Sequence, residues 1–202
     1  MCVKMGMLIV LTERKYIMEE NYTPDNVRSR LLFSGLKELE THGVTDFSLR
    51  RVAQDAGVSC AAPYRHFKDK DELIGAVIKF VVDGWTLLSE QISEIFASDT
   101  KALLTELAVA GVRFWVANGN FRTVISATAT LGSGQRGPLE DFDRPIVAAA
   151  KLYREEKAIS EPSDISFKIL SLIYGAVILV DGGYESADMA ADSLRSLLSN
   201  EL

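Results

Sequence analysis

The stretch from residue 48 to residue 70 constrains the fold most, because it predicts two short helices joined by a tight turn. Ser48 is a good N-cap. The apolar residues after it share one helical face: Leu49, Val52, Ala53 and Ala56. Gly57 stands where a helix ends in the left-handed conformation, and Ser59 is placed to cap a second short helix. This order is typical of a helix-turn-helix, whose second helix lies in the major groove of DNA.

The residues of the second short helix indicate a surface that reads base pairs. Arg65 can make a paired hydrogen bond to guanine, the commonest specific base contact. Ala61 and Ala62 are small, so the helix can lie deep in the groove against thymine methyl groups. Ser59 and the N–H groups beside it form a positive helix end that faces phosphate. Pro63 removes an N–H near the first turn, which predicts a short or distorted helix.

The run Tyr64-Arg65-His66-Phe67, followed by Lys70 and Leu73-Ile74, resembles the recognition helix and fourth helix of the tetracycline-repressor (TetR) family. The resemblance covers residues 24–85, and beyond them only the number and length of helices agree. It implies DNA contacts from the side chains of Tyr64, Arg65, His66, Lys70, Ser48 and Arg50. With the residues that open the second helix, the predicted DNA-binding set is Ser48, Arg50, Ser59, Cys60, Ala61, Ala62, Tyr64, Arg65, His66 and Lys70.

The rest of the chain shows helical periodicity without clear alternating strands, so we expect an all-α fold of about nine helices. Outside the helix-turn-helix, the predicted helices cover residues 23–42, 70–95, 100–118, 121–131, 145–157, 163–181 and 186–202. Thr23 is the expected cap of the first, and Asp69 with Glu72 forms a capping box before the long one. The segment from Gly132 to Asp143 is predicted to be a loop, with Pro145 in the first turn of the helix after it.

Three parts are predicted along the chain: a flexible extension over residues 1–21, a helix-turn-helix domain over 22–69, and a ligand-binding and dimerisation domain over 70–202. The helix predicted over 163–181 is apolar on most sides, which indicates burial on most sides. Its expected cover is a second copy, and the resemblance likewise implies a four-helix dimer bundle. The candidate interface residues are Leu172, Ile173, Val177, Val180, Leu194, Leu197 and Leu198. Burial in the chain's own core is the alternative.

Aromatic residues spread over the middle helices are candidates for an effector pocket: Trp85, Phe114, Trp115, Phe121, Tyr153 and Tyr174. If several converge, they line an apolar cavity of the kind that binds small molecules. Ordinary core packing is the alternative for each of them.

Few residues suit metal, cofactor or catalytic chemistry. Both histidines fall in the predicted DNA-binding domain, and Cys2 and Cys60 show neither metal-ligand spacing nor a disulfide framework. A reactive thiol at Cys60 remains an alternative. The run Gly132–Gly137 matches a dinucleotide fingerprint, but Pro138 and the lack of strands favour a loop. We expect no cofactor, no metal and no catalytic residues, and, without a membrane-spanning run, a cytoplasmic protein.

The formal net charge of −6 lies in residues 73–202, whereas residues 22–72 balance eight Lys/Arg against eight Asp/Glu. A neutral domain attracts DNA weakly, so binding must depend on a locally basic face and on dimerisation. The sequence predicts a homodimeric transcriptional regulator whose partners are double-stranded operator DNA, a second copy and an unknown small-molecule effector. The resemblance implies a repressor. The alternative is an all-α carrier or enzyme that does not bind DNA.

Overall fold

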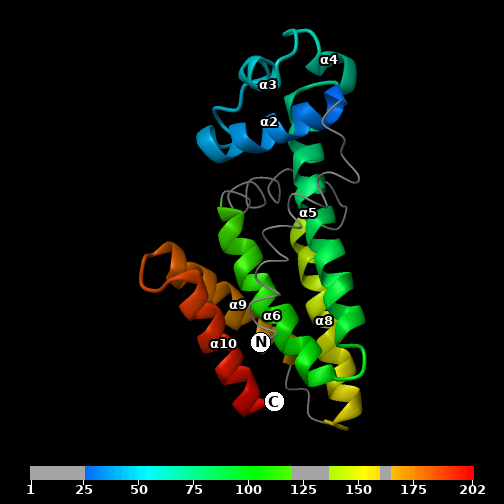
Figure 1. Cartoon of the computed structure of the whole chain (residues 1–202), viewed down its shortest axis with the longest axis vertical. Helices are drawn as coiled ribbons and strands as arrows, with labels where there is room; N and C mark the ends of the chain where they lie inside the picture. The colour runs from blue at the N-terminus through cyan, green and yellow to red at the C-terminus, as the bar shows by residue number, and fades with distance from the viewer. Residues whose placement is uncertain (1–25, 120–136, 160–164) are drawn as a thin grey trace. The chain divides into compact units, whose positions relative to one another are not determined.

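The computed structural model describes residues 26–119, 137–159 and 165–202, and each regular element in these ranges is an α-helix (Figure 1). The helices are α2 (Val27–His42), α3 (Leu49–Asp55), α4 (Pro63–His66), α5 (Lys70–Ile95), α6 (Thr100–Ala117), α8 (Pro138–Glu156), α9 (Ile165–Asp181) and α10 (Ala187–Glu201). The predicted all-α class is confirmed. The helix predicted over 121–131 lies outside the described residues.

The chain divides into two compact units, and the division falls between Gly84 and Trp85 within α5. We call the described residues 26–84 the head. We call the described residues from Trp85 onward the body. Each unit is described by itself.

Helix α2 of the head begins and ends at residues that satisfy its free backbone groups. Asn26 is extended, and its side chain accepts a hydrogen bond from the N–H of Arg28 at 2.9 Å. At the other end Gly43 has φ 69°, and its N–H donates to the carbonyl of Leu39 at 2.9 Å. The predicted end is therefore confirmed. The predicted cap at Thr23 is wrong, because Asn26 leaves the helical conformation and does the capping.

The head's core forms where α2 packs against the first part of α5. Leu31 and Leu73 are fully buried, and Phe33 meets Phe80 edge-on with ring centroids 5.5 Å apart. Gly35 lies close to α5, since a Cβ built on it would stand 2.9 Å from Val77 Cγ2. A larger residue there would require the Val77 side chain or one of the two helices to shift.

In the body, α6 packs against α8, α9 and α10, which also contact one another through α9. One face of each helix supplies the core, and its largest fully buried side chains are Trp85, Trp115, Phe142, Leu104, Leu107, Ile146, Ile169, Ile173 and Leu198. None of the helices in the part of the chain that the structure describes is both long enough and apolar enough to cross a membrane.

Helix α8 begins earlier than predicted. Pro138 occupies its first turn after Gly137, and Pro145 lies inside the helix rather than at its start. The helix continues past Pro145 because one apolar stripe runs through it: Phe142, Ile146, Ala149, Ala150 and Tyr153. The prediction of a loop is therefore wrong for residues 138–143.

Helix α9 buries one face rather than most of its surface. The buried residues repeat every fourth position: Ile165, Ile169, Ile173 and Val177. On α10 the buried set includes Leu194 and Leu198. Four predicted interface residues, Ile173, Val177, Leu194 and Leu198, thus pack inside the chain's own core. Leu197 is exposed, whereas Leu172 and Val180 are half-buried.

Candidate DNA-binding surface

Helix α3 and the turn after it have the geometry that the sequence predicts. The hydroxyl of Ser48 accepts a hydrogen bond from the N–H of Arg51 at 3.4 Å. Gly57 has φ 65°, its N–H donates to the carbonyl of Gln54, and the N–H of Val58 donates to the carbonyl of Ala53. These two bonds form a Schellman motif, which ends the helix and reverses the chain at a residue that needs the left-handed conformation.

The second helix of the motif, α4, is a single turn. It was expected to begin near Ser59, and that start is wrong. In such a helix the N–H of residue 63 would donate to the carbonyl of Ser59, but Pro63 has no N–H. The N–H of Ala62 makes a turn to Ser59 instead, at 2.8 Å, and Pro63 then opens the helix at its first position. The prediction that Pro63 shortens this helix is confirmed.

Three consecutive side chains of α4 reach solvent: Tyr64, Arg65 and His66. Tyr64 is 62% exposed, which is unusual for a large aromatic residue and excludes a role in the head's core. Ala62 is buried, so it is not brought to the exposed surface with them. The other predicted DNA-binding residues near it, Ser59, Cys60 and Ala61, are exposed.

The two residues of the predicted capping box fix the start of α5, although Glu72 accepts the N–H of Lys68 rather than that of Asp69. Asp69 accepts the N–H of Glu72 at 2.9 Å, and Glu72 accepts the N–H of Lys68 at 2.6 Å. Lys70, in the first turn, is half-buried and its ammonium donates to the carbonyl of Thr45 at 3.2 Å. An ammonium has three donors, so this contact orients Lys70 and leaves donors for a phosphate.

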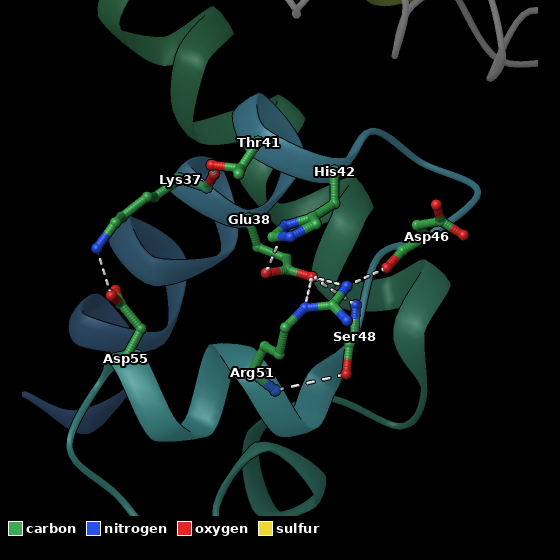
Figure 2. A network of polar contacts seen from close by, with 8 residues as sticks. All are labelled: Lys37, Glu38, Thr41, His42, Asp46, Ser48, Arg51 and Asp55. Carbon is green, nitrogen blue, oxygen red and sulfur yellow. Dashed lines mark hydrogen bonds and ion pairs between the residues drawn. The ribbon is translucent and has the colours of Figure 1, made fainter.

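A buried carboxylate that the sequence analysis did not single out joins α2 to α3 (Figure 2). Glu38 of α2 is only 6% exposed. Its Oε1 accepts the N–H of Ser48 at 3.0 Å and Nε of Arg51 at 2.8 Å, while Oε2 lies 3.2 Å from Nδ1 of His42. Glu38 therefore does from a neighbouring helix what a capping-box glutamate does from the third position. The available signal was a charged residue next to Leu39 on the buried stripe of α2.

The environment of Glu38 lowers the pKa of its carboxyl group. Burial alone raises the pKa of the carboxyl, but the hydrogen bonds from Arg51 and Ser48 and the charges of Arg51 and His42 outweigh it and lower the pKa. At the other end of α3, the Lys37 ammonium pairs with Asp55, and this bond together with one from Ser34 lowers the pKa of Asp55. Both carboxylates are thus committed to contacts inside the head.

Several cations of the head are exposed and are not held in ion pairs with described carboxylates. Glu38 and Asp55 are ion-paired, and Asp69 and Glu72 accept backbone N–H groups. Four cations are exposed and, within the described ranges, have no carboxylate at ion-pair distance: Arg28, Arg50, Arg65 and Lys68. The head thus presents exposed cations that are available for phosphate, although residues 22–72 carry no net charge by composition.

Four of the six predicted pocket residues gather in the body around Phe142, which the sequence analysis missed because it assigned Phe142 to a loop. Ring centroids lie 4.4 Å apart between Trp85 and Phe142 and 4.7 Å apart between Trp115 and Phe142. Phe114 and Tyr174 join the same cluster. We call these five rings the aromatic cluster.

Of the other two predicted pocket residues, only Tyr153 lies within the described ranges. The Tyr153 hydroxyl donates to the carbonyl of Leu202, and Phe121 lies outside the described residues. Beside the cluster, the hydroxyl of Tyr174 donates to Oδ1 of Asp143 at 2.6 Å. Burial raises the pKa of Asp143, and the bond from Tyr174 offsets only part of that effect. In the described ranges, no three His, Cys, Asp or Glu side chains are grouped to hold a metal ion.

Comparison with known proteins agrees with this geometry. Residues 31–77 match the family model described as bacterial regulatory proteins, tetR family. An HTH-type transcriptional regulator of Staphylococcus aureus (strain bovine RF122 / ET3-1) is 30% identical over 80 residues, which is 40% of this chain and 43% of that relative. The match therefore spans less than half of that relative's length. The nucleoid occlusion factor SlmA of Idiomarina loihiensis is 31% identical over 140 residues, covering 67% of this chain and 70% of SlmA.

Solved structures show the same fold. A protein of unknown function from Rhodococcus sp. RHA1 superposes with a TM-score of 0.66 at 24% identity, covering 91% of this chain and 99% of that one. FadR of Bacillus subtilis, in complex with stearoyl-CoA, superposes with a TM-score of 0.63 at 15% identity, covering 84% and 96%. From the family match, the extended similarity to SlmA and the helix-turn-helix of the head, the chain belongs to the tetR family of bacterial regulatory proteins.

Proposed function

We propose that this chain is a sequence-specific transcriptional regulator that binds a palindromic operator as a homodimer and acts as a repressor in the cytoplasm. The observation that carries the proposal is the exposure of Tyr64, Arg65 and His66 together on α4, next to the turn at Gly57. Side chains that serve only the head's core would be buried. Exposed aromatic and basic side chains on a helix-turn-helix suit a groove of DNA.

Each exposed side chain has a distinct role in this proposal. Arg65 makes a paired hydrogen bond to guanine and carries base preference. Tyr64 and His66 contact phosphates or base edges on either side of it. Arg50, exposed in the first turn of α3, and Lys70 contact phosphates, which set the position of α4 along the duplex.

An exposed apolar surface on α9, α10 and the turn between them supports the homodimer. Its exposed large residues are Phe167, Ile178, Leu179, Tyr184, Met189 and Leu197. A soluble monomer rarely leaves so many large apolar side chains of one hairpin in water. A second copy covers the same surface by two-fold symmetry and supplies the second head that a palindrome requires. This surface replaces the predicted interface residues that are buried in the chain's own core.

The aromatic cluster supports release by a small molecule. A half-buried carboxylate whose pKa is raised, such as Asp143, is costly to keep in a purely structural core. In this proposal Asp143 and Tyr174, which are hydrogen-bonded to each other, orient a ligand that packs against the rings. In the proposed mechanism the ligand favours a state of the dimer with lower affinity for the operator.

Selection of DNA from a randomised pool by the full-length chain tests the main proposal. The expected result is enrichment of a palindrome whose half-sites are about one helical turn apart. A gel shift then compares the selected duplex with one in which a half-site is scrambled. If no sequence is enriched and all duplexes bind equally weakly, the carrier interpretation, in which the body binds small molecules and the head does not bind DNA, is favoured.

A ligand screen by thermal shift tests the effector proposal, with stearoyl-CoA as one probe because the FadR structure contains it. A true effector raises the Tm of the chain and releases the selected duplex. Tyr174→Phe removes the hydroxyl that donates to Asp143 and should weaken both effects. A ligand that raises Tm equally in both proteins, without releasing DNA, would argue against an effector site beside Asp143.

A further inference from the structure

Arg28 lies outside the helix-turn-helix but reaches the end of its second helix. It is exposed in the first turn of α2, and its guanidinium carbon stands 5.4 Å from the centroid of the Phe67 ring. Phe67 directly follows His66 and is almost fully buried, so its ring is a fixed support. The N–H of Phe67 donates to the carbonyl of Pro63 at 2.8 Å, which ties that ring to α4. An exposed cation is therefore held beside the residues that face DNA.

Stacking leaves the hydrogen-bonding edge of the guanidinium free. A guanidinium on an aromatic face keeps its N–H donors in its own plane, pointing away from the ring. Among the described residues, no carboxylate lies within ion-pair distance of Arg28. Lys37, nine residues along the same helix, is by contrast paired with Asp55. The head thus neutralises one cation of α2 and leaves the other available.

A backbone phosphate is the ligand that fits this arrangement. Two parallel N–H groups of a guanidinium match two phosphate oxygens, and phosphates flank every groove that a recognition helix enters. The ring support also fixes the side chain in advance, so little conformational freedom is lost on binding.

We propose that Arg28 binds a phosphate of the DNA backbone, so that the DNA-binding surface extends from the helix-turn-helix to the first turn of α2. The proposal rests on the proposed DNA-binding function. Arg28 then strengthens binding to any duplex, while α4 carries the base preference. Because it adds one phosphate contact for each head, it contributes about two contacts to a dimer on its operator.

Binding of the full-length chain to the selected duplex and to a random-sequence duplex, measured over a range of salt concentrations, tests this proposal. Arg28→Gln should weaken binding to both duplexes by about tenfold or more and should lower the slope of log affinity against log salt by about 1.8 for a dimer. Arg28→Lys keeps the charge and should keep the slope, with weaker binding because the paired donors are lost. Lys37→Gln removes the same charge from the same helix and should leave the slope unchanged.

Neutral methylphosphonates, placed one at a time in the selected duplex, locate the contact. Replacing one particular phosphate in each half-site should weaken binding by the wild type. The same replacement should not weaken binding by Arg28→Gln any further, because that variant has already lost the contact. Equal sensitivity of wild type and Arg28→Gln at every phosphate, or an unchanged salt slope, would overturn the proposal and assign Arg28 a packing role on Phe67. If the wild type binds neither duplex, the DNA-binding function itself fails, which is a separate outcome.

Discussion

The side chain of Glu38 shows how one residue can hold a DNA-binding head in shape. Its carboxylate receives the N–H of Ser48 and the guanidinium of Arg51, so it fixes the first turn of α3 to α2. Arg50 lies in that turn and faces solvent. The buried Glu38 thus fixes the position of Arg50, for which we propose a phosphate contact.

Replacing Glu38 by Gln should destabilise the folded chain by about 1–2 kcal/mol at pH 7, measured by denaturant unfolding. Gln can still accept the N–H of Ser48 but loses the charge that pairs with Arg51. The lower figure reflects the partial exposure of Arg51, which weakens the pair. Asp55→Asn, which removes the exposed pair with Lys37, is the matched control and should cost less. Equal losses in the two variants would contradict the role given to Glu38.

The same residue predicts an acid dependence. The folded-state pKa of Glu38 lies below the ordinary value of 4.5. Its contribution to the free energy of unfolding is therefore complete above pH 4.5 and is lost as the pH falls through the folded-state pKa. Unfolding measured between about pH 6 and pH 3 should show a smaller acid loss in Glu38→Gln than in the wild type. Parallel curves would show that this carboxyl does not contribute to acid sensitivity.

Two basic residues of the DNA-binding surface should have separable effects. Arg65→Ala should narrow the affinity gap between selected and random duplexes by about 1–3 kcal/mol, because it removes a base contact. Lys70→Ala should weaken binding to both duplexes alike and flatten the salt slope, because it removes a phosphate contact. Titrations on both duplexes, at several salt concentrations, measure this. The same pattern for the two variants would refute the division of roles.

At the scale of the element, local signals predicted three boundaries in and next to the helix-turn-helix correctly, but not the caps expected at Thr23 and Ser59. Ser48 caps α3, Gly57 ends it, and Asp69 starts the helix after the motif, all by contacts within five residues. The predicted start of α8 is wrong because it places Pro145 in the first turn of the helix. The actual start depends on an apolar stripe that includes Phe142 and continues past Pro145. The contact of Glu38 with α3 was missed because it spans ten residues between two elements.

Gly57 should tolerate substitution by alanine poorly, because it lies in the left-handed region of backbone conformation. With φ 65° it adopts a conformation that costs an alanine about 1–2 kcal/mol, so Gly57→Ala should destabilise the chain by that amount. Gly75→Ala is the matched control, because Gly75 is exposed within α5 and a Cβ there meets open space. Gly75→Ala should stabilise the folded chain by about 0.5–1 kcal/mol. Chemical denaturation measures whether the free energy of unfolding falls in Gly57→Ala and rises in Gly75→Ala.

At the scale of the whole molecule, the sequence predicted which helices are apolar but not which faces stay uncovered. Periodicity marks both faces of α9 as apolar, and only the packing against α6 and α10 shows that Ile173 and Val177 face inward. Ile178 remains 66% exposed. In the same way, no local pattern could show that the aromatic cluster centres on Phe142, since its members come from four helices.

Ile178→Asp and Leu197→Asp should convert the proposed dimer into monomers, because each places a charge in the exposed apolar surface of α9 and α10. Light scattering measures the mass, and circular dichroism checks that the fold is kept. Leu152→Asp alters an equally apolar exposed site on α8 and should leave the mass unchanged. An unaltered mass in the first two variants would refute the proposed interface.

In the proposed function, the short length of α4 limits how many base pairs one head can specify. One helical turn presents three outward side chains, and Pro63 prevents it from growing toward Ser59. A recognition helix with so few base-contacting side chains specifies only a short sequence, which recurs by chance many times along a chromosome. A unique genomic site then requires two half-sites at a fixed spacing. A variant that cannot dimerise should therefore lose sequence selectivity even with every base contact intact.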